Sequence, residues 1–467
     1  MPDRRWLLLA IAVVLGTLSA LPLPSHLLRI GAASLALLIV MRLAWDPDWA
    51  VVLLFAFMPF RTLVGAMVPL PLKFVPDAIV FMLTVRLVAK HSEILFPLDA
   101  VEAFALLFLL VGLAATLHTD SSLPAAVLEG RDLLLFWLLY AVLRRLRAVG
   151  DGPSRELWDR ALKVGLASIA LVGVQGLLGL LSPDPQAFLI PGPWIHEPIT
   201  PVNLGRPYGW VNNPNVFGEL GFIGLVLVHH QVRTDRIRGT WGTLLGALFL
   251  AMVLFSYSRT AWIITFVGVA VYLIASRNMW ERLGLLAASL VLVLGIVGLP
   301  RAHHRAVTVA SHATILHSRH VGRLATLAMT RRIIRREPLG TGMGTFGSGA
   351  SKVFHQTVKG VPHAFYGDDN YAVLLVETGI GGFLLFLLTG IMVYRMLWIS
   401  RALRADRLAV FVLFAAMTLV AGTANAWEQL NLTFYPWIAL GWLLGVHTVG
   451  PRLPRGYKPL RTPSGPP

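Results

Sequence analysis

The chain has 467 residues, of which 56% are hydrophobic and only 14% are charged, against about 45–50% and about 25% in soluble domains, so an ordinary water-soluble protein is excluded. The 40 Lys and Arg exceed the 24 Asp and Glu, but they fall mainly between apolar runs, where the positive-inside rule explains them and no nucleic acid is expected. Cysteine is absent, which excludes disulfides, thiolate nucleophiles and Cys-based metal sites.

Apolar runs long enough to cross a membrane recur along almost the whole chain. About 17–25 apolar residues span a hydrocarbon core of about 30 Å as a helix, and the lack of period-two alternation argues against barrel strands. We therefore expect an all-α polytopic membrane protein with about 14 transmembrane helices, within a range of about 12–14. The predicted helices lie near 6–20, 27–44, 50–67, 76–90, 100–117, 131–146, 161–181, 214–230, 240–257, 260–276, 283–299, 371–396, 407–424 and 432–448.

The first three runs have features of their own. The run after Met1–Arg5 is similar to a signal peptide, but no small-residue cleavage site precedes Leu21, so we expect a retained helix. The first two runs are short enough to form a hairpin. The third is broken by Pro59 and by later prolines, which is compatible with a re-entrant segment.

The positions of Lys and Arg predict which loops face the cytoplasm. An even number of spans places both termini on one side, and the basic N-terminus makes that side cytoplasmic. The predicted cytoplasmic segments are Arg86–Lys90, Arg144–Arg160, Arg233–Arg238, Arg277–Arg282, Arg395–Arg407 and the tail from Arg452. The outer segments are then 118–130, 182–213, the turn near Ser258 and 300–370. The predicted organisation is therefore spans over 1–299, a large, partly helical outer loop over 300–370, spans over 371–450 and a cytoplasmic tail over 451–467.

The outer segment 182–213 ends in a polar stretch that leads into the next helix. It contains Arg206 and ends in Asn213-Pro214-Asn215. Proline suits the first turn of a helix, so Arg206 and Asn213 are expected at the outer mouth of the helix that begins near 214. Two interpretations are open. In one, the helix is simply capped and the arginine lies on the surface; in the other, the arginine contacts a substrate.

A short polar break, Ser256-Tyr257-Ser258-Arg259-Thr260, separates two apolar runs. An arginine at the outer boundary runs against the positive-inside trend. Either Arg259 reaches lipid phosphates at the surface, or it points into a polar cavity, because charges inside membranes are usually functional.

The 300–370 loop contains a basic helical stretch and a glycine-rich turn. The helix from Gly322 to Arg336 has arginine pairs four residues apart, and such a helix suits a membrane surface with anionic head groups. The stretch 338–344 superficially resembles a phosphate loop, but no strand precedes it and no Lys-Ser or Lys-Thr follows, so we expect a sharp turn.

The loop closes with His363 and with Asp368-Asp369-Asn370-Tyr371 ahead of the next helix. Asp369 is suited to cap that helix, and it is also a candidate base. A magnesium site needs more oxygen ligands than this stretch offers, and the histidines between 303 and 320 lack metal-ligand spacing. We expect neither a metal nor a cofactor.

All of these polar features fall on the predicted outer side. Arginines, a carboxylate pair and a histidine around one outward cavity would suit a substrate that carries phosphates and hydroxyls.

Between about Arg206 and Phe386 the chain resembles the O-antigen ligase and O-antigen polymerase superfamily of bacterial envelope glycosyltransferases. The resemblance rests on the order and spacing of Arg206–Asn215, Ser258–Thr260, Arg323–Phe346 and Asn370–Gly379. It implies a multi-span glycosyltransferase of the bacterial inner membrane, with both termini in the cytoplasm and the active site in the periplasm. It also implies metal-independent, inverting transfer of a glycan from undecaprenyl diphosphate to a sugar hydroxyl, in assembly of lipopolysaccharide O-antigen or exopolysaccharide.

The resemblance implies roles for single residues as well. Arg206, Arg259 and Arg323 match the family arginines that bind the diphosphate, and Arg259 would also stabilise the leaving group. Asp369 would accept the hydroxyl proton, with His363 as the alternative base. The expected supporting residues are Asn213, Asn215, Asn370 and Tyr371.

The acceptor is left open by the sequence. Ligases of this family commonly have His-Asn-Ser-Tyr where this chain has Asp369-Asn370-Tyr371, and Asp-Asn variants are similar to polymerases or exopolysaccharide members. The acceptor is therefore either another glycan or a lipid A-core, with membrane lipids around the protein. The alternative function is a transporter or flippase for an anionic lipid-linked substrate, although the midplane site and internal repeat of a transporter are not evident.

Overall fold

The regular secondary structure of the described part of the chain is helical. The computed structural model describes residues 4–20, 26–67, 72, 74–95, 98–181, 207, 209–211, 213–307, 323–346, 369–400, 402–422 and 430–445. Within these residues there are α-helices and short 3-10 helices but no strand, as predicted. Each predicted helical range coincides with a helix, and the break at Pro59 takes the form of a 3-10 turn, η1 (Met58–Phe60).

The helices have the following bounds. The first half of the chain contains α1 (Arg4–Ala20), α2 (His26–Ala44), α3 (Pro47–Phe57), α4 (Arg61–Met67), α6 (Val75–His91), α7 (Ala100–His118), α8 (Leu123–Ala148) and α9 (Arg155–Leu178). The second half contains the 3-10 turn η4 (Gly209–Val211), α10 (Pro214–Arg233), α11 (Gly239–Phe255), α12 (Arg259–Ala275), α13 (Met279–Gly298), α14 (Pro300–Val307), α16 (Arg323–Arg336), α18 (Asn370–Ile399), α19 (Arg404–Ala421) and α20 (Leu430–Gly445).

Local capping signals explain where several helices begin. At α7 the Asp99 carboxylate accepts from the Glu102 N–H at 2.8 Å, and the Glu102 carboxylate accepts from the Asp99 N–H at 2.9 Å. The side chains of Ser122, Ser154 and Ser258 cap α8, α9 and α12, each by accepting from one backbone N–H. These side chains satisfy backbone N–H groups that a helix start leaves unpaired, which fixes the helix ends by sequence.

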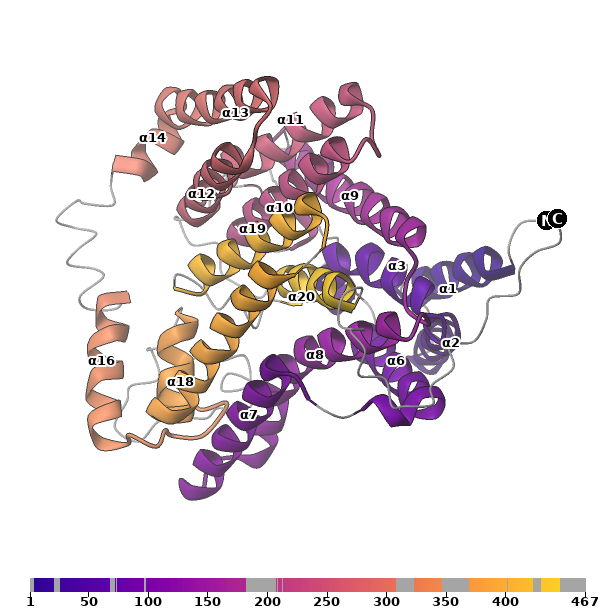
Figure 1. Cartoon of the computed structure of the whole chain (residues 1–467), viewed down its shortest axis with the longest axis vertical. Helices are drawn as coiled ribbons and strands as arrows, with labels where there is room; N and C mark the ends of the chain where they lie inside the picture. Colours follow the sequence, from indigo (N-terminus) through magenta and orange to yellow (C-terminus); the bar gives the residue numbers. More distant parts are fainter. Residues whose placement is uncertain are drawn as a thin grey trace.

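Helix α20 lies in the middle of the bundle (Figure 1). All of its residues from Leu432 to Gly445 are buried, as expected for a helix that is apolar on every side. Gly441 lets it approach α8 closely, because a Cβ there would lie 2.9 Å from the Tyr140 carbonyl oxygen. Trp442 stacks on Trp158 of α9 with ring centroids 4.5 Å apart.

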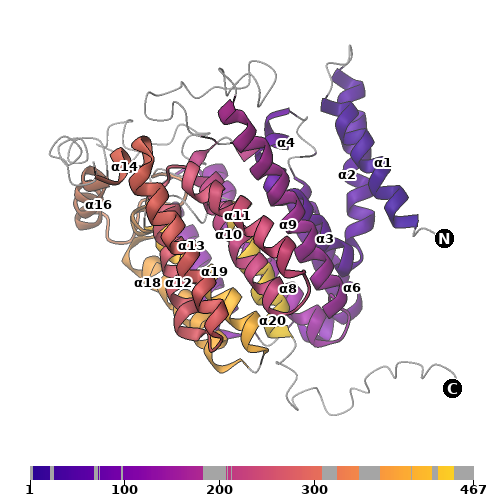
Figure 2. The same ribbon diagram turned by 90° about the horizontal axis from the view of Figure 1, so that it is seen from above.

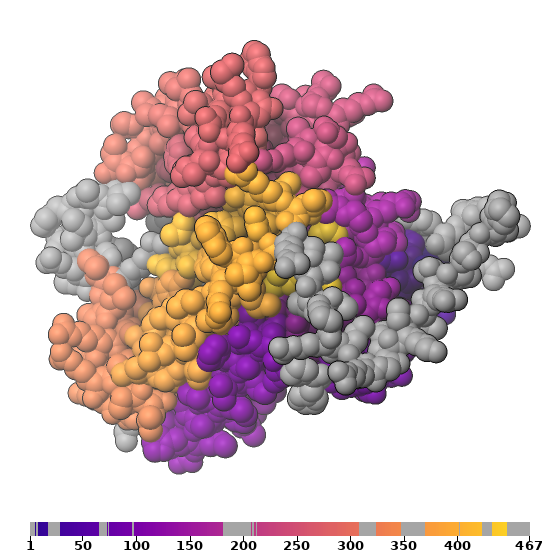
Figure 3. Space-filling model, viewed as in Figure 1, coloured from indigo at the N-terminus to yellow at the C-terminus, as the bar shows by residue number. Residues whose placement is uncertain are grey.

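Helices α1 and α2 pack against each other as a hairpin at the edge of the bundle (Figure 2). At the other side of the molecule, α18 lies between α7 and α16 (Figures 1 and 3). Helix α18 is kinked at Gly379, whose φ is 69°. The kink makes room for the chain at Pro338 and Leu339, since a Cβ at Gly379 would lie 2.4 Å from the Leu339 carbonyl carbon.

Among the described residues, five helical segments are long and apolar enough to cross a membrane. They are Pro47–Val64, Ala100–His118, Arg155–Leu178, Met279–Gly298 and Asn370–Ile399. The apolar helices Gly239–Phe255, Arg259–Ala275 and Leu432–Gly445 are shorter. The number of about 14 spans therefore stays a prediction.

Ion pairs join segments that the sequence predicts to be cytoplasmic. Arg86 pairs with Asp151, Arg155 pairs with Asp406 at 2.5 Å, and Asp406 also lies 2.6 Å from His230. These contacts gather the ends of α6, α8, α9, α10 and α19 at one end of the bundle. We call this the basic end, and we call the opposite end, where α10, α12 and α18 begin, the polar end.

Candidate functional site

The structure describes some of the predicted site residues and not others. Arg259 is the first residue of α12, Asp369 precedes α18, and Asn213 precedes α10. Arg323 begins α16, although nothing is described of its side chain. Arg206 and His363 lie outside the described residues, so their predicted roles stay predictions.

The start of α10 lies next to the turn that contains Arg259. A Cβ at Gly218 would be 2.4 Å from the Ser256 hydroxyl, so only glycine permits this approach. Ser256 and Ser258 are buried, and the Ser258 side chain caps α12 by accepting from the Ala261 N–H at 3.3 Å. Arg259 therefore sits on a rigid turn, at a helix N-terminus whose partial positive charge favours anions.

Helix α14 brings two further arginines to this turn. Burial and the charge of Arg259 both lower the pKa of Arg305. Burial raises the pKa of the Tyr257 phenol, and the charge of Arg301 opposes that rise. Arg301 and Arg305 are four residues apart on one helix, and their charges act on Tyr257 and Arg259 of the 257–259 turn. We call Arg259, Arg301 and Arg305 the arginine cluster.

The arginine cluster concentrates positive charge where an anion would be stabilised. Like charges close together repel each other, and a bound diphosphate would relieve that repulsion while accepting paired hydrogen bonds from guanidinium groups. The sequence reasoning included Arg259 but missed Arg301 and Arg305. Their spacing on a short helix directly after a predicted span was the available signal.

The predicted residues around α10 have structural roles. The Asn213 side-chain oxygen accepts from the Asn215 N–H at 2.8 Å and caps the helix, while Asn215 is exposed. Just before them, the Trp210 N–H donates to the Gln175 side chain at 3.0 Å, and the Trp210 ring lies 5.6 Å from that of Phe60. These contacts fix the end of the predicted outer segment 182–213 on α9 and η1.

Asp369 caps α18, as predicted. Its carboxylate oxygen Oδ1 accepts from the Tyr371 N–H at 2.9 Å and from the Ala372 N–H at 3.4 Å. Asn370 is buried. The Tyr371 hydroxyl donates to the Thr418 carbonyl oxygen at 2.7 Å, which ties the start of α18 to the end of α19. Helix α19 also packs against α10 and α12.

The glycine-rich stretch is a turn, as predicted, and it docks on α18. We call residues 337–346 the glycine turn; Gly340, Gly342 and Gly344 have φ values of 95°, 94° and 75°, which glycine adopts easily. The fully buried carboxylate of Glu377 accepts from the Gly344 N–H at 2.9 Å and from the Phe346 N–H at 2.7 Å. On the opposite side, the Thr341 carbonyl oxygen accepts from the side chains of Thr119 and Ser121.

Replacing Glu377 with Gln is expected to loosen the glycine turn. An amide has one acceptor oxygen instead of two, so one buried N–H of the turn loses its partner, at a cost of about 1–3 kcal/mol. Hydrogen exchange at the Gly344 and Phe346 amides should become faster and the melting temperature should fall. The control is Glu337→Gln, because Glu337 is exposed on the same turn. Unchanged exchange at both amides in Glu377→Gln would contradict this role.

Helix α16 packs one face on α18 and leaves its basic residues exposed. Met329 and Ile333 contact Phe346, Val373 and Val376, so one face of α16 is buried on α18. Leu324 and Leu327 are exposed, together with the basic residues Arg331, Arg332, Arg335 and Arg336. Tertiary packing on α18, which the sequence pattern alone does not reveal, decided the orientation.

The structure shows a second set of charged residues within the bundle that the sequence analysis did not identify. Arg131 on α8 pairs with Asp77 on α6 at 2.5 Å and with its neighbour Asp132 at 2.9 Å. The charge of Arg61, at the start of α4, interacts with the charges of Arg131, Asp77 and Asp132. Charged residues inside apolar runs are the signal that would have found this set.

Glu219 on α10 is a buried carboxylate. Only 2% of its surface is exposed, and neither carboxylate oxygen has a hydrogen-bond partner in the described part of the chain. It lines a small cavity with Ile264, Met417 and Leu432. An unsatisfied polar group in such surroundings costs stability, and an ionisable residue within a membrane is a candidate for function.

Replacing Glu219 with Met is expected to stabilise the protein by about 1–3 kcal/mol, because an apolar side chain of similar length removes the unsatisfied oxygens. Glu219→Gln keeps a polar group there and should leave stability nearly unchanged. Thermal unfolding of both variants in one detergent would measure the difference. A Met variant that melts below the unsubstituted protein would show that the carboxylate has a stabilising partner.

The fold and the site together indicate the class of protein. A helical chain with several apolar helices of membrane-crossing length, and with arginines gathered at the helix starts, is an integral membrane protein. The model of the family described as O-antigen ligase matches residues 244–387, the segment that contains Arg259, the glycine turn and Asp369. This segment is therefore similar to the O-antigen ligase family, and the match supports a membrane glycosyltransferase of the O-antigen ligase or polymerase type. Comparisons with curated proteins and with solved structures gave no match.

Proposed function

We propose that the protein transfers a glycan from an undecaprenyl-diphosphate-linked donor to an acceptor sugar hydroxyl at the periplasmic face of the inner membrane. The observation that carries this proposal is the arginine cluster, which lies at the N-terminus of α12 within the family-matched segment. A diphosphate is the anion that such a donor brings, and guanidinium groups grip its oxygens in pairs. Arg206 and Arg323 are proposed to complete the diphosphate site.

The proposed reaction is an inverting displacement. The acceptor hydroxyl oxygen forms a bond to the anomeric carbon while the bond from that carbon to the diphosphate oxygen breaks. Negative charge grows on the departing undecaprenyl diphosphate, so arginines that are already in place stabilise the transition state more than the ground state. The hydroxyl proton passes to a base, for which we propose Asp369, with His363 as the alternative.

The cap at α18 gives Asp369 a defined orientation. Two backbone N–H groups hold its Oδ1 atom, and the buried Asn370 and the bond from Tyr371 to Thr418 hold the helix start. A base that is fixed in this manner needs little rearrangement to meet the acceptor hydroxyl.

Reconstitution tests the proposed function directly. Purified protein in liposomes would be given an undecaprenyl-diphosphate-linked oligosaccharide and a glycan acceptor, and free undecaprenyl diphosphate would be measured. Release that depends on both protein and acceptor supports glycosyl transfer. Movement of intact donor between leaflets without release would instead support a flippase. Offering a second lipid-linked glycan and a lipid A-core in separate reactions would distinguish a polymerase from a ligase.

A further inference from the structure

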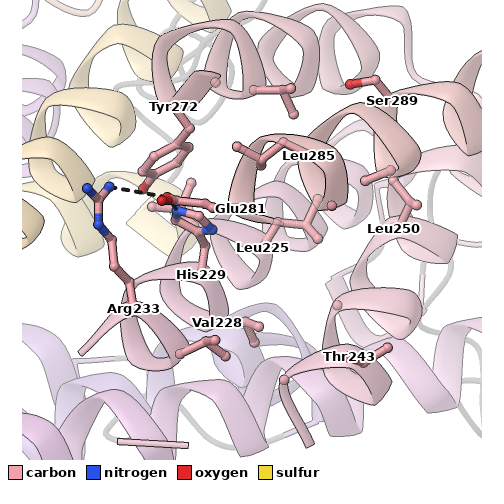
Figure 4. A pocket seen from close by; sticks show the side chains of 18 of the residues that line it. Leu225, Val228, His229, Arg233, Thr243, Leu250, Tyr272, Glu281, Leu285 and Ser289 are labelled. Atoms are coloured by element: carbon pink, nitrogen blue, oxygen red, sulfur yellow. Dashed lines mark ion pairs between the residues drawn. The ribbon is translucent and has the colours of Figure 1, made fainter. Parts of the chain in front are cut away.

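A cavity of about 750 Å³ lies between α10, α11, α12 and α13 at the basic end of the bundle (Figure 4). Its size falls within the range of about 300–1,000 Å³ that is usual for ligand sites. It is separate from the candidate site, because Tyr272 at the cavity lies about 20 Å along α12 from Arg259, at about 1.5 Å per residue.

Four of the polar residues of the cavity gather on one side of it. Figure 4 shows Tyr272, Glu281, His229 and Arg233 together, while Leu225, Leu250 and Leu285 line the remaining space. A Glu281 carboxylate oxygen lies 2.9 Å from the His229 ring nitrogen Nε2 and 3.3 Å from an Arg233 nitrogen.

Tyr272 provides an independent sign of a ligand. Its side chain is only 5% exposed, and its hydroxyl has no hydrogen-bond partner in the described part of the chain. The Tyr272 ring lies 4.2 Å from the His229 ring, so the hydroxyl is held beside the charged groups. A buried hydroxyl without a partner is costly, and a polar ligand group would satisfy it.

The depth of the cavity matches one leaflet of a bilayer. Along α10 the lining extends from Arg233 to Phe222, which is about 16 Å, or roughly half of a hydrocarbon core of about 30 Å. Trp280 at the cavity and Trp241 on α11 are 76% and 61% exposed. Exposed tryptophans near helix ends are typical of the head-group level.

Missing side chains leave the cavity open. Gly246 on α11 and Gly284 on α13 both line it, and neither has an atom within 4 Å of the place where a Cβ would stand. Helix α13 has only 6% of its apolar window buried, so lipid chains surround its outer side. A lipid can therefore enter the cavity beside this helix.

We propose that this cavity binds one phospholipid with a zwitterionic, ammonium-bearing head group. The acyl chain fills the apolar part along α10 and α13. Arg233 and the Tyr272 hydroxyl donate to the phosphate, while the carboxylates of Glu281 and Asp235, both at the cavity, attract the ammonium group. Because the cavity has both signs of charge at one end, it suits such a head group better than a purely anionic one.

Native mass spectrometry of the full-length protein tests the proposal. The protein would be exchanged into detergent with equal amounts of dioleoyl phosphatidylethanolamine, dioleoyl phosphatidylglycerol and undecaprenyl phosphate, and the retained lipid would be identified. We expect one retained phosphatidylethanolamine and a melting temperature that rises with its concentration. Preferential retention of either of the other lipids, or of none, would overturn the proposal.

Variants with larger side chains in the cavity test whether the lipid binds there. Gly246→Phe and Gly284→Leu place side chains at positions where a Cβ meets no atom within 4 Å, and the matched control is Gly390→Phe, since the Cβ position at Gly390 on α18 is open in the same way. We expect about tenfold lower retention in both filling variants and none of this loss in the control. Tyr272→Phe should also weaken the preference for the ethanolamine lipid. Equal retention in Gly246→Phe, Gly284→Leu and Gly390→Phe would show that the lipid binds elsewhere.

Discussion

Replacing Arg259 with Ala is expected to lower the rate of undecaprenyl diphosphate release by about 10²–10³-fold, the usual cost of removing one group that stabilises transition-state charge. The guanidinium group leaves the N-terminus of α12, where Ser258 still caps the helix. The helix should therefore form as before, and the loss should appear mainly in kcat. Measurement of kcat and KM with purified protein, together with its melting temperature, would show both effects.

Two further variants make the Arg259 result specific. Arg160→Ala removes an arginine whose side chain is 63% exposed and pairs only with Glu156 four residues earlier, and such surface pairs contribute little. It should keep full activity. Arg259→Lys keeps the charge but cannot grip two oxygens at once, so we expect partial activity. Full activity in Arg259→Ala would remove the arginine cluster from the mechanism.

The helices were predictable because their signals are local. These signals are apolar runs, serine and aspartate caps and the proline at 59. Each can be recognised within a few residues of the chain, and each coincides with a helix or with a break. Which helix lies in the centre was not predictable in this manner. The run 432–448 is no more apolar than several others, yet α20 is buried by α8, α10 and α19. Burial of this kind depends on contacts between distant segments.

The candidate site was predictable only in part, for the same reason. The sequence identified Arg259, Asp369 and the glycine turn, because each interrupts or begins an apolar run. It did not show that Glu377 holds the turn, since that contact joins residues about thirty positions apart in the chain. Arg305 was missed because only the folding of α14 onto the 257–259 turn brings it near Arg259.

Asp369 has two roles in the proposed mechanism, and one substitution can separate them. As a cap, its Oδ1 atom accepts two backbone N–H groups at the start of α18. As a base, it must accept a proton. Asparagine caps a helix as well as aspartate does, but its amide does not take up a proton at neutral pH. Asp369→Asn should therefore keep the melting temperature while the transfer rate falls by about 10²–10⁴-fold.

The matched control for that variant is Asp46→Asn, because Asp46 caps α3 by accepting from the Asp48 N–H at 3.1 Å and lies in a segment predicted to be cytoplasmic. It should leave the rate unchanged.

His363→Gln supplies the comparison between the two proposed bases. If Asp369 is the base, His363→Gln loses far less activity than Asp369→Asn. The reverse order would assign proton transfer to His363 and leave Asp369 with the helix cap alone, as in a ligase-like arrangement. Because the cap is preserved in Asp369→Asn, a lost rate cannot be attributed to a lost helix.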